Sequence, residues 1–179
     1  MSYRDMIDED LMLMDERDQE SSRLLSPHEI QVPLRSLMDI PVTIGIGTSV
    51  QAAIDLMLSN NVGAILVVSD GILKGIFGER DVLYHILNKS VGDLTQIPVE
   101  RFMKADPQTS HVDDSLDLAI FHMARGGYRH IPIVDDQNRP VGMVSIRHII
   151  SYLVEHFPQE ILTLPPEPLR HSVKNREGA

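Results

Sequence analysis

Histidine and serine are the residue types of this sequence that we first consider as metal ligands, nucleophiles or catalytic bases. The chain has eight histidines and no cysteine, and the lack of cysteine excludes a thiolate metal site, a cysteine nucleophile and a disulfide framework. The histidines at His122, His130, His148 and His156 form neither a His-Glu-x-x-His motif nor pairs spaced i, i+4. We therefore expect no zinc site.

Two other patterns could belong to an active site. Ser145 and His148 could pair as nucleophile and base, but no nucleophile elbow or oxyanion-hole motif accompanies them. The segment with Gly45, Gly47 and Thr48 lacks the Lys-Ser/Thr that follows a phosphate-binding glycine loop. The sequence thus predicts a protein that is not an enzyme and requires no cofactor.

Composition narrows the class further. The 179 residues are 42% hydrophobic and 23% charged, as in an ordinary globular protein. The net charge of -10 opposes binding to nucleic acid or anionic membrane, and 4% aromatic residues without Trp offer no base-stacking platform. We see no apolar run near the roughly 20 residues of a membrane span and no secretory signal. We expect a cytoplasmic protein with neither nucleic acid nor membrane as partner.

An internal repeat organises the chain. Shifting the sequence by 66 positions gives nine identities within residues 41–70, where average composition would give roughly two. The identical pairs are Pro41 and Pro107, Thr43 and Thr109, Ser49 and Ser115, Ala53 and Ala119, Ile54 and Ile120, Met57 and Met123, Ile65 and Ile131, Val68 and Val134, and Asp70 and Asp136. The match extends to Pro33–Met38 with Pro98–Met103 and to Gly75–Phe77 with Gly142–Val144.

Each copy predicts the same elements, β-α-β-β-α, and so an α+β fold. Apolar residues at helical spacing predict a helix that ends at Asn60–Asn61, with a Thr48/Gln51 capping box, and a second one with Asp114 as N-cap that ends at Gly126–Gly127. The predicted strands are Ile65–Val68 and Leu73–Phe77, then Ile131–Val134 and Val141–Ser145. The predicted final helices are Glu79–Leu87 and Ile146–His156.

A copy of about 55 residues is marginal alone, so we expect the two to pack as a pseudo-two-fold pair. Packing would create two quasi-equivalent clefts, which is where ligands bind. We place an acidic arm at 1–31, the first repeat at 32–90, the second at 91–157 and a Pro-rich polar tail at 158–179. Met6, Ile7, Leu11 and Met14 recur at helical spacing in the arm, which is either a docking helix or a solvated segment.

The repeat and its motifs resemble the CBS-domain pair, or Bateman module, over roughly Val32 to Phe157. Gly75–Asp81 and Gly142–His148 are similar to the family's Gly-x-x-Ser/Thr-x-x-Asp signature at a strand-to-helix junction. Tyr128–Asp135 resembles its Arg-His-x-Pro-Val-Val-Asp strand. The resemblance implies a regulatory module that binds an adenosine-containing ligand between the repeats.

The resemblance also implies site residues in one cleft. Asp81 would take the ribose hydroxyls, and the helix from Glu79 would hold phosphate together with Arg129 and His130. Gly78 stands where a hydroxyl is expected, so phosphate contact there would fall to backbone N–H groups. Arg80, Thr43 and Ile44 complete the predicted ligand-binding set.

The second cleft departs from the family pattern. It keeps Ser145, and Thr109 on its first strand, but His148 replaces the aspartate. Gly63 and Ala64 stand where Arg129 and His130 stand in the other copy. We expect this cleft to be empty or to bind something different.

Structural roles remain open for the same residues. Asp81 could favour the helix dipole, and Arg129 with His130 could be an exposed edge pair. Thr43 and Thr109 could be ordinary strand residues. Arg80 and Arg147 could be exposed on their helices, while Ile44, Ile76 and Val42 fit a core better than a ligand wall.

Two functions follow from these patterns. The first is a sensor of an adenine nucleotide, with AMP, ADP or ATP favoured over S-adenosylmethionine or NAD, that signals to an unidentified regulated protein. The alternative is a non-catalytic interaction or scaffold protein with vestigial clefts. The resemblance implies a homodimer in either case.

Overall fold

The computed structural model describes residues 30–87 and 92–158. The predicted acidic arm and Pro-rich tail therefore lie almost entirely outside the described residues, and both stay predictions. By their contacts, the described residues up to Tyr152 belong to one compact unit. Both repeats lie in this unit, so the fold and the sites below are those of residues 30–152.

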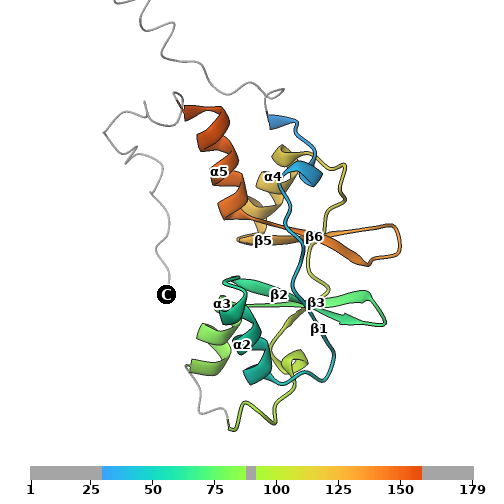
Figure 1. The fold of residues 1–179 in the computed structure, drawn as a ribbon, viewed down its shortest axis with the longest axis vertical. Coiled ribbons are helices and arrows are strands. Elements are labelled where there is room, and N and C mark those ends of the chain that lie inside the picture. The colour runs from blue at the N-terminus through green and yellow to red at the C-terminus, as the bar shows by residue number, and fades with distance from the viewer. Residues whose placement is uncertain (1–29, 88–91, 159–179) are drawn as a thin grey trace, which may run out of the picture. The chain divides into compact units, whose positions relative to one another are not determined.

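The first repeat is built on a hairpin, strands β2 (Ala64–Ser69) and β3 (Ile72–Gly78). Strand β1 (Thr43–Gly45) pairs with β2 in parallel, and helix α2 (Val50–Ser59) connects them. The chain then continues into the single helical turn α3 (Glu79–Asp81) and the π-helical segment η3 (Val82–Leu87). Figure 1 shows α2 and α3 on one side of this hairpin.

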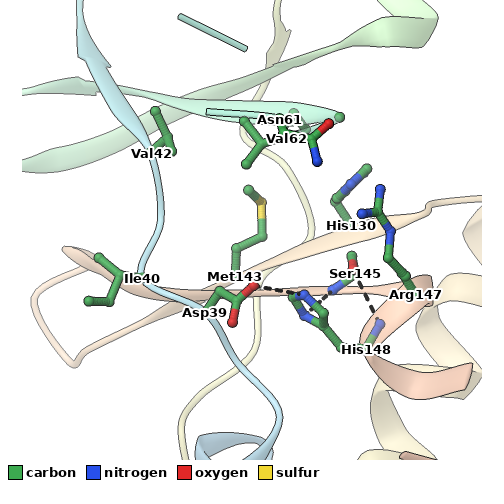
Figure 2. A pocket seen from close by; sticks show the side chains of 12 residues that line it. Asp39, Ile40, Val42, Asn61, Val62, His130, Met143, Ser145, Arg147 and His148 are labelled. Carbon is green, nitrogen blue, oxygen red and sulfur yellow. Dashed lines mark hydrogen bonds and ion pairs between the residues drawn. The ribbon is translucent and has the colours of Figure 1, made fainter. Parts of the chain in front are cut away.

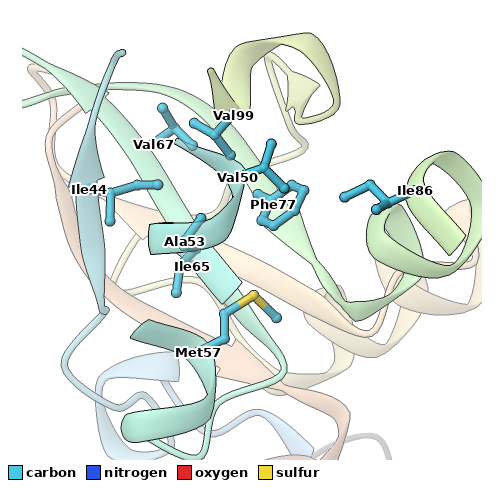
Figure 3. Packing of buried hydrophobic residues seen from close by; sticks show 9 residues of the cluster. All are labelled: Ile44, Val50, Ala53, Met57, Ile65, Val67, Phe77, Ile86 and Val99. Carbon is cyan, nitrogen blue, oxygen red and sulfur yellow. The ribbon is translucent and has the colours of Figure 1, made fainter. Parts of the chain in front are cut away.

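A hydrophobic cluster lies between these elements. Figure 3 shows Phe77, with none of its surface exposed, surrounded by apolar side chains from α2, β1, β2 and η3. The cluster consists of Ile44, Val50, Ala53, Met57, Ile65, Val67, Phe77, Ile86 and Val99. Burial of this apolar surface is what holds α2 and η3 against the sheet.

The second repeat has the same order of elements with a smaller sheet. Strands β5 (His130–Val134) and β6 (Pro140–Ser145) form its hairpin, flanked by α4 (Leu116–Gly126) and α5 (Ile146–His156). The counterpart of β1 is reduced to one parallel bridge between Ser110 and Ile133. The repeat found in the sequence is therefore a structural repeat, with an incomplete first strand in the second copy.

The segment before each repeat pairs with the other repeat. The turn η2 (Leu34–Ser36) donates its Leu34 N–H to the Asp114 carbonyl at 2.9 Å, and Asp39 forms an antiparallel bridge with Met143 on β6. The turn η4 (Val99–Arg101) and strand β4 (Lys104–Ala105) do the same for the first repeat. Their Val99 N–H reaches the Thr48 carbonyl, and Lys104 pairs with Ile76. We call Pro33–Asp39 and Pro98–Ala105 the exchanged segments.

The two hairpins also share a small apolar cluster. Ala64, Leu66 and Leu73 from the first repeat pack with Val134 and Met143 from the second. The Leu73 N–H adds a backbone hydrogen bond of 2.9 Å to the Asn138 carbonyl. The predicted sheet-to-sheet packing of the repeats is confirmed.

Most of the predicted ends of helices and strands agree with the structure, whereas two predicted helix caps and one predicted helix differ from it. Helix α5 spans the predicted residues, and Gly127 ends α4 in the left-handed region with φ of 66°. The capping box was wrong, because Ser49 caps α2 while the Thr48 hydroxyl donates to the Gly45 carbonyl. The Asp114 cap was also wrong, because Ser115 is the N-cap and the Asp114 carboxylate accepts from the His111 N–H. The predicted helix Glu79–Leu87 changes to π geometry after Asp81.

Candidate functional site

One cleft between the repeats has the size of a small-molecule site. Its volume is about 400 Å³, and clefts that hold small molecules enclose roughly 300–1,000 Å³. We call it the Asp81 cleft. Its walls are Gly63, Ala64, Ile76, Gly78, Glu79, Arg80, Asp81, Leu83, Tyr84, Lys104, Gly126, Gly127, Tyr128, Arg129 and His130.

Asp81 occupies the third position of α3 and is half-buried. One of its oxygens accepts the Gly78 N–H at 2.9 Å, which caps the start of the helix. Burial raises the pKa of the Asp81 carboxyl from its ordinary value of 3.8, partly offset by the Gly78 hydrogen bond and by the charges of His85, Arg80 and Lys104. A carboxylate held this way retains acceptor capacity toward the cleft, because an ionised carboxylate accepts more than one hydrogen bond.

Three cationic side chains line the Asp81 cleft. Arg80 reaches across it and donates from Nη1 to the Gly127 carbonyl at 3.1 Å. Lys104 comes from β4, and its Nζ lies 4.1 Å from the centre of the Tyr128 ring. Arg129 is exposed just before β5. Against Glu79 and Asp81, these cations leave the wall with a small positive excess, which suits an anionic group.

His130 lies between two clefts and differs from the cation that the sequence predicted. Its ring comes within 3.3 Å of where a side chain on Gly63 would begin. Burial lowers the pKa of His130 below 6.5, and the charges of His148, Arg147 and Arg129 lower it further, while Glu79 opposes them. Near neutral pH the imidazole is therefore uncharged, and it can serve a ligand as a hydrogen-bond donor or acceptor.

Two backbone N–H groups at the start of α3 bond within the protein. The Gly78 N–H is bonded to Asp81, and the Glu79 N–H donates to the Gly63 carbonyl at 3.1 Å. The expected phosphate contact by backbone N–H groups stays a prediction. The positive charge of this cleft comes from Arg80, Arg129 and Lys104.

Thr43, Ile44 and Thr109 do not line the clefts to which the sequence assigned them. Ile44 is buried in the core of the first repeat, and Thr43 is exposed on β1. Because the segments are exchanged, Asp39, Ile40 and Val42 line the second cleft, while Lys104 lines the first. The predicted Asp81, Gly78, Arg80, Arg129 and His130 do come together.

Sequence reasoning missed Lys104, Tyr84 and Tyr128. Lys104 directly follows the matched segment Pro98–Met103, but no local pattern marks it as a cleft residue, because it pairs with Ile76 of the other repeat. No signal marks Tyr84 either, whose place in the cleft depends on the turn of the η3 segment.

The second cleft, which we call the His148 cleft, is much smaller, with a volume of about 90 Å³. Figure 2 shows three of its polar residues, Ser145, His148 and Asp39, joined to one another, with His130, Arg147 and Asn61 also lining the cleft. The His148 Nδ1 accepts the Ser145 N–H at 3.2 Å, and its Nε2 lies 2.9 Å from an Asp39 carboxylate oxygen. The Ser145 hydroxyl accepts the His148 N–H at 3.4 Å.

These features define a class of protein: tandem βαββα repeats with ligand-sized space between them. The CBS domain model matches residues 34–88 and 99–155, so the chain belongs to the CBS domain family. It is 36% identical over 104 residues to the CBS domain-containing protein YhcV of Bacillus subtilis, covering 58% of this chain and 72% of that protein. It is 28% identical over 120 residues to the meiotically up-regulated gene 70 protein of Schizosaccharomyces pombe, covering 67% of this chain but 16% of that protein.

Solved structures share the fold. An uncharacterized conserved protein from Pyrococcus horikoshii matches with a TM-score of 0.63 and 26% identity, over 69% of this chain and 92% of that one. The CBS domain protein PAE2072 from Pyrobaculum aerophilum, complexed with AMP, matches with a TM-score of 0.62 and 22% identity, over 69% and 97%. The CBS domain pair of protein MJ0100, in complex with 5′-methylthioadenosine and S-adenosyl-L-methionine, matches with a TM-score of 0.61 and 23% identity. This match covers 68% of this chain and 99% of that one.

The described residues show neither a membrane-spanning helix nor a metal-binding cluster. Within 30–87 and 92–158, no helix is long and apolar enough to cross a membrane. Over the same ranges, no group of three or more His, Asp or Glu side chains is arranged to hold a metal ion.

Proposed function

We propose that this chain is a ligand-sensing regulatory module that binds an adenine nucleotide in the Asp81 cleft. The observation that carries the proposal is the convergence, in one cleft of about 400 Å³, of a half-buried carboxylate and three cationic side chains from both repeats. Structural neighbours that hold AMP, 5′-methylthioadenosine or S-adenosyl-L-methionine support this class of ligand. CBS domain pairs are generally regulatory rather than catalytic, which agrees with this role.

The chemistry of the walls fits the parts of a nucleotide. Asp81 can accept hydrogen bonds from a ribose diol, and the diol would partly replace the water that burial has removed. Ala64, Ile76 and Leu83 offer an apolar surface to a purine. Arg80, Arg129 and Lys104 supply charge for phosphate, with Arg able to bind it in bidentate fashion.

The count of cations bears on which ligand is favoured. Three positive side chains against the carboxylates of Glu79 and Asp81 suit an anionic ligand better than a sulfonium. We therefore propose AMP, ADP or ATP ahead of S-adenosylmethionine or NAD. Because Arg80 spans from the first repeat to Gly127 in the second, a bound phosphate would compete for Arg80 and change a contact between the repeats. Such a change is how ligand binding would be passed to a partner protein.

Calorimetric titration of adenosine, AMP, ADP, ATP, S-adenosylmethionine and NAD tests the proposal. We expect about one molecule of nucleotide bound per chain, with Asp81→Ala weakening binding by at least roughly tenfold. Absence of saturable binding by the wild-type protein at millimolar concentration would contradict the proposal.

Asp81 also caps a helix, so the alanine variant needs a structural control. Asp81→Asn keeps an oxygen that can accept the Gly78 N–H but removes the charge and one acceptor oxygen. We expect this variant to stay folded and still bind weakly. Asp55→Asn, on the exposed face of α2, is the matched control that should leave binding unchanged.

We also propose a homodimer and a regulated partner protein. Large apolar side chains are exposed on the helical elements of the compact unit, among them Leu83, Tyr84 and Phe121, with Tyr84 65% exposed. Such surface is typical of an interaction site. Sedimentation equilibrium of the full chain measures the first of these proposals directly.

A further inference from the structure

Three polar residues of the His148 cleft, Asp39, Ser145 and His148, bond to one another. His148 uses both ring nitrogens, accepting the Ser145 N–H at Nδ1 and facing the Asp39 carboxylate with Nε2 at 2.9 Å. An acceptor at Nδ1 places the proton of the neutral ring on Nε2, from which it is donated to Asp39. Neither nitrogen is available to a ligand while this arrangement lasts.

The position of Asp39 is fixed by the fold. Its N–H donates to the Met143 carbonyl at 3.1 Å, and its own carbonyl accepts the Met143 N–H at 3.0 Å. The carboxylate is thus delivered to the second repeat by an exchanged segment, and its side chain is 77% exposed at the mouth while that of His148 is 25% exposed. We call this contact the Asp39–His148 bridge.

The other walls of the cleft include apolar side chains as well as Asn61, His130 and Arg147. Ile40, Val42, Val62 and Met143 give it an apolar lining, as Figure 2 shows. At the corresponding places, the Asp81 cleft has its carboxylate on the helix and Lys104 on the exchanged segment. The carboxylate thus lies on the helix in one cleft and on the exchanged segment in the other.

We propose that the Asp39–His148 bridge keeps the His148 cleft closed to nucleosides, so that these two residues decide that the chain has one ligand cleft rather than two. A nucleoside entering this cleft would have to break the bridge without meeting an acceptor for its ribose hydroxyls at position 148. The exposed Asp39 carboxylate would in addition repel a phosphate, against the attraction of Arg147, which also lines the cleft. This inference rests on the proposed function, since it assumes that the Asp81 cleft binds a nucleotide.

Moving the carboxylate from the exchanged segment to the helix of the His148 cleft tests the proposal by gain of binding. In an Asp81→Asn background, which weakens the first cleft, Asp39→Lys with His148→Asp reproduces the charge arrangement of the Asp81 cleft. Adenosine is the probe, because it has no phosphate and so does not depend on the cations missing at Gly63 and Ala64. We expect Asp81→Asn alone to bind adenosine weakly, and the combined variant to regain affinity within about tenfold of the wild-type protein.

The outcomes separate this inference from the proposed function. If the wild-type protein binds adenosine or AMP but the folded combined variant gains nothing, the bridge does not control the cleft and the inference is wrong, while the proposed function stands. If the wild-type protein binds neither, both fail. Asp39→Ala with His148→Asp is a second variant, which removes the bridge without adding a lysine, and the same regain of adenosine affinity is expected.

A measurement on the unmodified protein is independent of any variant. Nitrogen-15 chemical shifts of His148, assigned with His148→Gln, report which ring nitrogen carries the proton. The bridge requires the proton on Nε2. A ring protonated on Nδ1 alone would overturn the proposal, whatever the variants do.

Discussion

The Asp81 and His148 clefts share a backbone and differ in the side chains that this backbone presents. In each, the first N–H of the helix after the hairpin donates to the carbonyl of the residue just before the hairpin: Glu79 to Gly63 at 3.1 Å, and Ile146 to Arg129 at 2.9 Å. In each, the residue before the helix donates its N–H to a side chain three positions on, Asp81 or His148. The cap therefore needs only an acceptor, and a carboxylate or an imidazole satisfies it equally.

The backbone of a cleft and the side chains that it presents to a ligand can therefore vary separately. Because either acceptor keeps the helix start intact, one cleft can lose its ribose carboxylate without loss of the fold. The two halves also differ in packing, since the first has a four-stranded sheet and the second a two-stranded one.

The largest effect is expected in the core of the first repeat. Phe77 and its counterpart Val144 are both fully buried. We expect Phe77→Ala to lower the free energy of unfolding by about 3–5 kcal/mol, and Val144→Ala by about 2 kcal/mol, since only two methyl groups are removed. Urea unfolding followed by circular dichroism measures both. Equal losses would contradict the expected difference between the two buried side chains.

A smaller effect tests whether the exchanged segments pack symmetrically. A methyl group on Gly75 would meet the Met103 sulfur and the Lys104 carbonyl, and one on Gly142 would meet the Met38 sulfur. We expect Gly75→Ala and Gly142→Ala each to cost about 1–3 kcal/mol of stability. Gly92→Ala is the matched control, because nothing lies within 4 Å of its added methyl.

Rescue would identify the contact responsible. Combining Gly142→Ala with Met38→Ala should give a smaller loss than the sum of the two single losses, because the shortened side chain no longer meets the methyl group. Strictly additive losses would mean that Met38 is not the obstacle.

The smallest effect concerns the charge of His130. Burial lowers the pKa of folded His130 below 6.5, so the unfolded chain binds the proton more readily and stability falls as the pH drops through 6.5. We expect His130→Gln to flatten the decline of the thermal midpoint between about pH 7.5 and 5.5. His111→Gln, at an exposed position, is the control and should leave the decline unchanged. A decline that persists in full in the His130 variant would contradict the shift.

Local patterns predicted the elements well because their causes are local. Helix α4 ends at Gly126 with Gly127 as its C-cap, as the Gly126–Gly127 pair indicated, since glycine takes a left-handed conformation at no steric cost. The predicted strand pairs lie within a residue or so of the observed hairpins, because alternation and turn residues act over a few positions. The helix caps failed because Thr48 and Asp114 each bond within the preceding turn, one residue before the true cap.

The sequence predicted only those residues of the candidate site that belong to a motif of one repeat, either at the start of α3 or at the start of β5. Asp81, Arg80, Arg129 and His130 came from motifs, and the structure brings them together. Lys104 and Asp39 were missed because they arrive through segments that cross to the other repeat, a pairing that no local pattern reveals. Whether the assembled residues bind a nucleotide stays a prediction.

The exchanged segments have a consequence for how the chain reaches its native state. Leu34 is bonded to Asp114, so the native contact closes a loop of about 80 residues before the first segment is in place. Neither repeat can complete its own edge while the other is missing, and long-range closure of this kind slows folding. During synthesis the first hairpin must therefore wait, with one edge unpaired, until β4 has left the ribosome.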